Sequence, residues 1–193
     1  MKLAAVVLAA GSATRFGSDK LSAPFHGEPL VFHAIRAARA APVEKVVIVA
    51  HPALNIGVWA GEPCTEVVRM TSDGLSISLR AGLSASGEVD GLFVFLGDMP
   101  LVPHNAAQRL AEKIGDHYAA LPRYHGTPGH PVLLSCRAFA DVLTLTGDAG
   151  AAKLLRARSD VLFDDCPNPL IHLDVDRPED LGWLARRGRE EEE

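Results

Sequence analysis

The chain has 193 residues, of which 48% are hydrophobic and 22% charged, and its formal net charge is -5. This size and composition predict a single globular domain over residues 1–187, followed by a disordered tail over residues 188–193. The negative charge argues against nucleic acid as a partner. No run approaches the roughly 20 apolar residues that cross a bilayer, so we expect no membrane partner and a cytoplasmic protein.

Strand-like and helix-like runs alternate along the chain, which predicts an α/β fold with a largely parallel sheet covered by helices on both faces. We expect strands at 3–8, 43–50, 65–70, 91–96, 118–121, 131–134, 161–163 and 171–173. We expect helices at 29–41, 77–84, 103–114, 137–143, 149–156 and 178–187. The three cysteines lie far apart without metal-ligand spacing, which is typical of reduced thiols.

The first predicted strand ends at Gly11, in a loop that carries the cations Arg15 and Lys20. Ligands of α/β proteins bind at the carboxyl ends of strands, and free backbone N–H groups beside a lysine suit phosphate. The spacing from Gly11 to Gly17 excludes the dinucleotide fingerprint, and two residues between Gly17 and Lys20 exclude the P-loop. The loop therefore predicts a phosphate site of another kind, with an ordinary flexible turn as the alternative.

Asp98, in the segment L-G-D-M-P, follows the very apolar predicted strand at 91–96. Its carboxylate would repel a triphosphate at the first loop unless a cation lay between the two. Mg²⁺ commonly binds one or two carboxylates together with substrate phosphates. Taken alone, the segment also suits a simple turn, but beside the Gly11 loop we favour a metal ligand.

The segment D-V-D-x-P-E-D, residues 174–180, offers further carboxylates. Asp176 suits the N-cap of the last helix, with Glu179 completing a capping box. The same strand-to-helix junction also suits a metal ligand. Because side chains alternate along a strand, Asp174 and Asp176 would face opposite sides, and we favour Asp176 for the metal.

Small polar residues precede the predicted helix at 77–84. Gly74, Ser76 and Ser78 are suited to bring backbone groups and hydroxyls close to a ribose or base. The alternative is that Ser76 caps the helix. Further along the chain, Asp148 suits the N-cap of the helix at 149–156.

In order along the chain, the motifs are L-A-A-G-x-x-x-R-F-G-x-x-K, G-L-S-x-S-L-x-x-G-L, L-G-D-M-P, G-x-P-G-H-P, G-D-x-G-A and D-V-D-x-P-E-D. Together they resemble the molybdenum cofactor cytidylyltransferase branch of the molybdopterin nucleotidyltransferase-like family, from residue 3 to about residue 184. The first and third motifs are shared with many nucleotidyltransferases. The pair G-x-P-G-H-P and G-D-x-G-A is narrower and points to the cofactor branch.

This resemblance implies a three-layer α/β/α sandwich with a mostly parallel, Rossmann-like sheet. It implies that the N-terminal half binds CTP and the C-terminal half binds molybdopterin, with Mg²⁺ as the cofactor. The terminal phosphate of molybdenum-molybdopterin would attack the α-phosphorus of CTP, giving molybdopterin cytosine dinucleotide and pyrophosphate. Transient contact with a recipient molybdoenzyme is also expected.

The resemblance also implies roles for individual residues. The expected catalytic residues are Arg15, Lys20 and Asp98, and the expected metal ligands are Asp98 and Asp176. The expected nucleotide-binding residues are Leu8, Ala9, Ala10, Gly11, Arg15, Lys20, Gly74 and Ser78. The expected acceptor-binding residues are Gly129, His130, Asp148 and Gly150, although a lone histidine is more often structural.

Base choice is predicted from residues 9–11, because relatives that use GTP tend to have Ala-Gly-Gly there. The methyl group of Ala10 would crowd a purine, and one methyl group changes such discrimination by about 1–3 kcal/mol. CTP is therefore favoured over GTP. The alternatives are guanylyl transfer to molybdopterin, transfer to another phosphorylated metabolite, and a carrier that delivers finished cofactor. A carrier would not need to bind Mg²⁺ and a triphosphate, so the presence of Lys20, Asp98 and Asp176 argues against that alternative.

Overall fold

The structure is a computed structural model that describes residues 1–11, 19–148, 150–156 and 158–190, so Arg15 lies outside the described residues. The strands are β1 (Leu3–Ala9), β2 (Pro24–Phe25), β3 (Glu28–Pro29), β4 (Lys45–Ala50), β5 (Cys64–Arg69), β6 (Gly91–Leu96), β7 (Ala119–Tyr124), β8 (Thr127–Pro128), β9 (Val132–Ser135) and β10 (Val161–Asp165). The α-helices are α1 (Leu30–Ala40), α2 (Leu75–Ser86), α3 (His104–Lys113), α4 (Phe139–Thr144), α5 (Ala151–Leu155) and α6 (Pro178–Glu190). The 3-10 helices are η1 (Lys20–Ser22), η2 (Cys136–Ala138) and η3 (Pro169–His172).

Eight of the described strands form one sheet in the order β10-β7-β9-β6-β1-β4-β5, with β8 paired to β7. Strand β1 is parallel to both β4 and β6, β4 is parallel to β5, and β7 is parallel to β10. Strand β9 is antiparallel to its neighbours β6 and β7. The carboxyl ends of β1 and β6 therefore meet at one edge of the sheet, the edge where such folds bind ligands.

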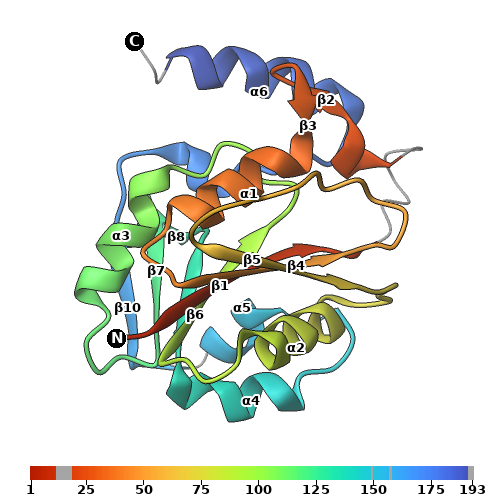
Figure 1. The fold of residues 1–193 in the computed structure, drawn as a ribbon. Coiled ribbons are helices and arrows are strands. Elements are labelled where there is room, and N and C mark those ends of the chain that lie inside the picture. Colours follow the sequence, from red (N-terminus) through yellow and green to blue (C-terminus); the bar gives the residue numbers. More distant parts are fainter. Residues whose placement is uncertain (12–18, 149, 157, 191–193) are drawn as a thin grey trace.

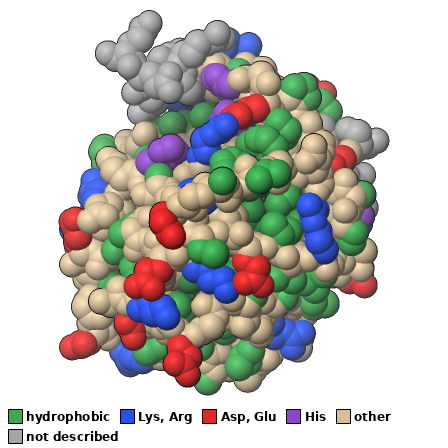
Figure 2. Space-filling view, viewed as in Figure 1, with side chains coloured by type: hydrophobic (Ala, Val, Ile, Leu, Met, Phe, Trp, Pro, Cys, Tyr) green, Lys and Arg blue, Asp and Glu red, His purple; other side chains and the backbone are tan. Residues whose placement is uncertain are grey.

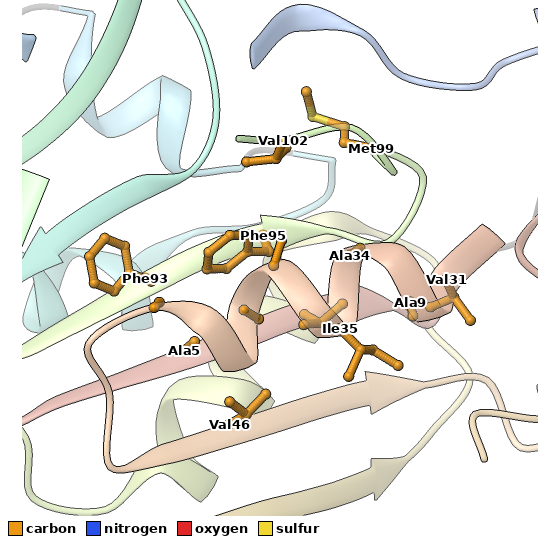
Figure 3. Packing of buried hydrophobic residues seen from close by; sticks show 14 of the residues in the cluster. Ala5, Ala9, Val31, Ala34, Ile35, Val46, Phe93, Phe95, Met99 and Val102 are labelled. Atoms are coloured by element: carbon orange, nitrogen blue, oxygen red, sulfur yellow. The ribbon is translucent and has the colours of Figure 1, made fainter. Parts of the chain in front are cut away.

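Side chains of the sheet alternate between two buried clusters, because successive strand residues point to opposite faces. Ala5, Val7 and Ala9 of β1 pack with residues of α1, α3 and α6 in one cluster (Figure 3). Val6 and Leu8 pack with residues of α2, α4 and α5 in the other. Figure 1 shows the same two helix layers on opposite sides of the sheet. The protein is thus an α/β/α sandwich of Rossmann-like type, as predicted.

The predicted strand at 171–173 is wrong, because Pro169–His172 forms the 3-10 helix η3. Pro169 occupies its first turn, where the missing N–H costs no hydrogen bond. The side chain of Asn168 accepts a hydrogen bond from the Leu170 N–H at 2.8 Å. This local capping outweighs the short apolar pattern that suggested a strand. The last helix also extends three residues beyond the predicted end, to Glu190.

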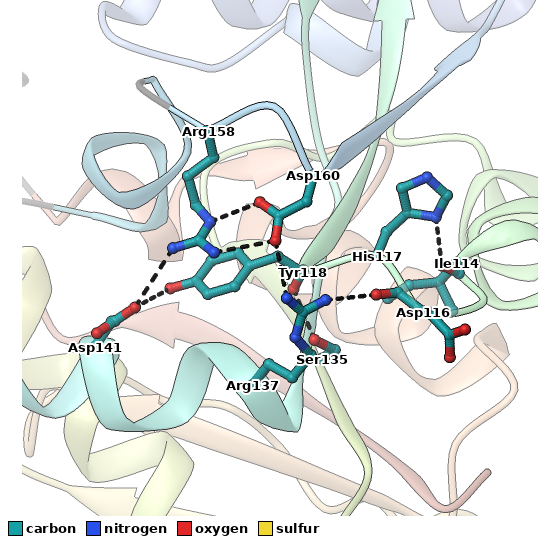
Figure 4. Close-up of polar contacts among 9 residues, drawn as sticks. All are labelled: Ile114, Asp116, His117, Tyr118, Ser135, Arg137, Asp141, Arg158 and Asp160. Carbon is teal, nitrogen blue, oxygen red and sulfur yellow. Dashed lines mark hydrogen bonds and ion pairs between the residues drawn. The ribbon is translucent and has the colours of Figure 1, made fainter.

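A polar cluster joins α4 to the connection between α5 and β10 (Figure 4). The guanidinium of Arg158 lies 3.5 Å from the ring centroid of Tyr118, and its Nε lies 2.8 Å from Asp160. The Tyr118 hydroxyl donates to Asp141 at 2.7 Å. Burial and this hydrogen bond raise the pKa of Tyr118 to about 12. The cluster fixes the chain directly after α5.

The opposite face carries ion pairs between α3 and β10. Arg109 lies 2.8 Å from the buried carboxylate of Asp164, and Lys113 pairs with the same group. Acidic and basic side chains are interspersed over the face of the molecule that Figure 2 shows. Among the described residues, no helix combines the length and the apolar character that a membrane span requires.

Candidate active site

The first cavity has a volume of about 540 Å³ and lies at the carboxyl ends of β1 and β6. Every described residue predicted to bind the nucleotide lines it, together with Asp98: Leu8, Ala9, Ala10, Gly11, Lys20, Gly74 and Ser78. Gly97 allows the two strand ends to approach closely. Its N–H donates to the Leu8 carbonyl at 3.0 Å, and a Cβ at this position would lie 3.0 Å from the same oxygen.

Lys20 and Asp98 are in direct contact in this cavity. The Lys20 Nζ lies 2.8 Å from Asp98 Oδ2 and 3.6 Å from Asp176 Oδ1. The side chain of Lys20 is 13% exposed and that of Asp98 is 25% exposed. Their interaction is therefore less screened than that of a pair at the open surface. The first loop and the end of β6, 78 positions apart in sequence, meet at one point.

Asp174 and Asp176 lie in a non-strand segment that follows η3, so the alternation argument that separated them does not apply. Desolvation raises the pKa of Asp174 above its ordinary value, and the carboxylates of Asp176 and Asp98 raise it further. The Val175 N–H donates to the Asp98 carbonyl oxygen at 2.9 Å, and the Val175 side chain is fully buried. Both aspartates are thereby held near Asp98.

The predicted capping box at α6 is also wrong. The helix begins at Pro178, so Arg177 rather than Asp176 directly precedes it. Asp180, not Glu179, reaches back to the helix start. Its Oδ2 accepts hydrogen bonds from the N–H groups of Asp176 at 2.9 Å and Arg177 at 2.7 Å. This interaction holds the backbone of the residue whose side chain faces Lys20.

Helix α2 begins one residue after Gly74, and its start contacts the C-terminal half of the chain. Ser76 does not cap the helix, because Gly74 occupies the N-cap position. The fully buried Ser76 donates its hydroxyl to the Gly147 carbonyl at 2.7 Å. A Cβ at Gly74 would lie 2.5 Å from that same oxygen, so only glycine fits this contact. Ser78 is buried and lines the first cavity.

Ala10 lines the first cavity but exposes only 2% of its surface. Its side chain belongs to the buried cluster beneath α2 rather than to the open space. The methyl group therefore presents little surface to a nucleobase. This weakens the steric argument that the sequence offers for a pyrimidine.

A second cavity of about 440 Å³ adjoins the first. All four predicted acceptor-binding residues line it: Gly129, His130, Asp148 and Gly150. Leu8, Leu75, Leu96 and Asp148 line both cavities and therefore form their shared boundary. A molecule in each cavity would meet its neighbour across this boundary.

Two glycines shape the second cavity through close approaches. A Cβ at Gly129 would lie 2.6 Å from the Ile171 carbonyl oxygen, and one at Gly150 would lie 2.5 Å from Leu75 Cδ2. Gly150 also occupies the N-cap position of α5, without a side-chain capping bond. The prediction that Asp148 is the N-cap is therefore wrong. The exposed Asp148 instead lies at the boundary of the two cavities.

His130 contributes a neutral imidazole to this wall. Burial lowers its pKa below the ordinary value. Its Nδ1 is buried and has no hydrogen-bond partner among the described residues. The backbone N–H of His130 donates to the Ile171 carbonyl at 2.9 Å, which fixes the residue in place. Native structures rarely leave such a buried nitrogen without a hydrogen-bond partner.

Comparison with known families decides the identity of this two-cavity fold. A family model described as the MobA-like NTP transferase domain matches residues 5–161. The chain belongs to the MobA-like NTP transferase family. It is a nucleotidyltransferase.

Individual relatives of this MobA-like protein differ in their sequence identity to it and in the share of each chain that aligns. A molybdenum cofactor guanylyltransferase from Rhodobacter capsulatus is 27% identical over 98% of both chains. The bifunctional protein GlmU of Syntrophomonas wolfei is 31% identical over 58% of this chain, which spans only 26% of the length of that relative. A solved Mycobacterium strain JC1 homolog of Rv0371c from Mycobacterium tuberculosis covers 97% of both chains with a TM-score of 0.84 and 26% identity.

The MobA-like site has donors that suit a divalent metal ion. Hard carboxylate oxygens of Asp98 and Asp176 already bracket a cation, the Lys20 ammonium. Among the described residues, no group of three or more His, Cys, Asp or Glu side chains is arranged to enclose a metal by itself. This donor set fits Mg²⁺, which commonly completes its coordination with water and substrate phosphate oxygens.

Sequence reasoning missed several lining residues of the MobA-like cavities, among them Leu75, Lys153 and Arg156. Leu75 is 36% exposed although it begins a helix with a buried face. Lys153 and Arg156 are three positions apart, a spacing that puts them on one helical face. That spacing was the available signal for the two cations, but only the tertiary structure brings this face to the cavity.

Proposed function

We propose that this nucleotidyltransferase transfers CMP from CTP to the terminal phosphate of molybdenum-molybdopterin. A phosphate oxygen of the acceptor forms a bond to the α-phosphorus, the bond from that phosphorus to the β-phosphate oxygen breaks, and pyrophosphate leaves. The observation that carries the proposal is the pair of adjoining cavities, with the Lys20–Asp98 contact in the first. Two substrates can thus meet at their shared boundary.

On the nucleotide side, the chain supplies positioning and charge rather than covalent chemistry. Lys20 holds the β- and γ-phosphates and stabilises the departing pyrophosphate, and we assign Arg15 the same task. The backbone at 8–11 follows the triphosphate, while Gly74 and Ser78 lie against the nucleoside. The low exposure of Lys20 supports this role, because a sheltered ammonium interacts more strongly with phosphate.

Asp98 and Asp176 would hold the metal ion, for which we propose Mg²⁺. When bound, such an ion neutralises phosphate charge and reduces the repulsion between the acceptor phosphate and the α-phosphate. Lys20 must then exchange its carboxylate partners for phosphate oxygens. Asp174, with its raised pKa, remains the alternative second carboxylate.

On the acceptor side, Gly129, His130, Asp148 and Gly150 lie around the pterin. The neutral imidazole of His130 forms part of the wall against the pterin, and the close glycine contacts leave no room for side chains at Gly129 and Gly150. Asp148 lines both cavities, so its carboxylate lies where the two substrates would meet.

A second candidate is guanylyl transfer to the same acceptor. It is favoured by the Rhodobacter capsulatus relative, a molybdenum cofactor guanylyltransferase aligned over 98% of both chains. The burial of the Ala10 methyl removes one argument against a purine. CTP is nevertheless our proposal, because the six sequence motifs taken together resemble the cytidylyltransferase branch.

Pyrophosphate release, measured with each of the four nucleoside triphosphates and with or without molybdopterin, tests the proposal. We expect release only with CTP, Mg²⁺ and molybdopterin together. Turnover with GTP and the same acceptor would establish the second candidate. Turnover with a sugar phosphate would refute the acceptor, and binding of finished cofactor without any turnover would indicate a carrier that passes it to a molybdoenzyme.

A further inference from the structure

The two cavities differ in the sign of the charged side chains around them. Besides the shared Asp148, the described charged residues of the first are Asp19, Lys20, Asp73 and Asp98. Those of the second are Lys153 and Arg156. Counted over the described residues, the lining of the first cavity thus has excess negative charge, whereas that of the second has excess positive charge.

Lys153 and Arg156 lie on one face of α5 and its last turn. On the same helix, Ala151 and Leu155 are buried in the cluster beneath the sheet. This packing orients the helix about its axis and leaves the two cations at the cavity. Arg158, just beyond, pairs with Asp160 and stacks on Tyr118, which fixes the end of the segment (Figure 4).

Neither cation is committed to another group within the described part of the chain. No hydrogen bond or ion pair there involves the side chain of Lys153 or Arg156. The neighbouring Arg137 and Arg158 both pair with Asp160. Two uncommitted cations beside a cavity are available to an anion, and arginine and lysine are the side chains that bind oxyanions best.

Resting on the proposed function, we infer that Lys153 and Arg156 bind a second anionic group of the acceptor. This group is distinct from the phosphate that attacks CTP. Both cations line only the second cavity, whereas the reacting phosphate must reach the boundary with the first. Val94, Leu121 and Val132 form an apolar part of the same wall, suited to a flat heterocycle. The acceptor is therefore a heterocyclic phosphate monoester that carries a second negatively charged group.

Substitution of both cations tests this inference, with metal-free molybdopterin as the probe. Lys153→Gln combined with Arg156→Gln should raise the dissociation constant of molybdopterin, measured without CTP, by about tenfold. The KM for the acceptor should rise equally, whereas kcat and the KM for CTP should change less than twofold. The exchange Lys153→Arg with Arg156→Lys keeps both charges and should keep the wild-type constants. Arg186→Gln, an exposed cation on α6, is the matched control.

Three outcomes would contradict the inference. Unchanged molybdopterin binding by the double variant, with normal turnover, overturns the inference and leaves the proposed function intact. A fall in kcat at unchanged KM would mean that these cations hold the reacting phosphate. If the wild-type protein neither binds nor converts molybdopterin, the acceptor is wrong and both proposals fail.

Discussion

The cavities proposed for the nucleotide and for the acceptor adjoin one another but are built in different ways. The first is formed by the ends of the central strands β1 and β6, and its basic side chain, Lys20, is paired to Asp98. The second is formed by connecting segments and the short helix α5, and its cations are unpaired among the described residues. A polyphosphate entering the first cavity needs a metal ion to offset the carboxylates, whereas an anion entering the second does not.

This contrast also concerns rigidity. The first cavity rests on fully buried strands, and backbone hydrogen bonds tie Gly97 to Leu8 and Val175 to Asp98. The second depends on close contacts between segments far apart in sequence, such as Gly129 against Ile171. Precise alignment at phosphorus is needed where the bond forms, and a rigid strand edge supplies it.

Removal of the Asp98 carboxylate should have the largest effect and should be confined to the nucleotide cavity. We expect Asp98→Ala to lower kcat by at least about 10³-fold, because the charge that holds the metal ion is lost. Molybdopterin binding should stay within twofold of wild type. Asp116→Asn, an exposed aspartate far from both cavities, is the control. Retained turnover in Asp98→Ala, with an unchanged circular dichroism spectrum, would remove Asp98 from the mechanism.

Substitution of Gly74 by alanine should impair substrate binding in both cavities. Gly74→Ala places a Cβ against the Gly147 carbonyl oxygen, which would lie 2.5 Å away. We expect a loss of about 1–3 kcal/mol in the free energy of unfolding, measured in urea, and about a tenfold rise in both KM values. Gly182→Ala on α6 is the control, since its nearest neighbouring atom lies 3.9 Å away. A change in the KM for CTP alone would show that Gly147 does not couple the cavities.

Loss of the Asp180 carboxylate should lower turnover only by weakening the binding of the metal ion. Asp180→Ala leaves the N–H groups of Asp176 and Arg177 without their acceptor, so Asp176 is held less firmly. We expect the Mg²⁺ concentration for half-maximal turnover to rise about threefold to tenfold. Direct Mn²⁺ binding in the presence of CTP should weaken in parallel. Asp180→Asn keeps an acceptor oxygen and should restore most of the affinity, while Glu179→Ala should resemble wild type.

The smallest effect concerns the pH dependence of stability. The pKa of His130 is lowered in the folded state, so below about pH 6.5 the unfolded chain binds a proton that the folded chain does not. This difference lowers the stability as pH falls, by up to about 1.4 kcal/mol per pH unit. Between pH 7.5 and pH 5.5, the free energy of unfolding, measured in urea, should fall less for His130→Gln than for the wild-type protein. Identical pH dependence in both proteins would exclude a buried neutral imidazole.

Elements with a strong local signal were predictable from sequence. The apolar runs of β1 and β6 and the amphipathic helices were placed within a few residues of their observed bounds. The short segment at 171–173 was not, because a proline and the Asn168 cap outweigh three apolar residues. The capping role belongs to Asp180 rather than Glu179, because Arg177, not Asp176, directly precedes the helix.

The sequence alone determined the α/β class, the glycine loop with Lys20, and the carboxylate of Asp98 at a strand end, because each depends on local pattern. Only the tertiary structure decided that Lys20 and Asp98 touch, that Asp174 and Asp176 both lie near Asp98, and that Lys153 and Arg156 line a cavity. The physical reason is that these contacts join distant segments, whose approach depends on sheet order and on the burial of both helix layers. Periodicity specifies which face of an element is buried, but not which other element covers it.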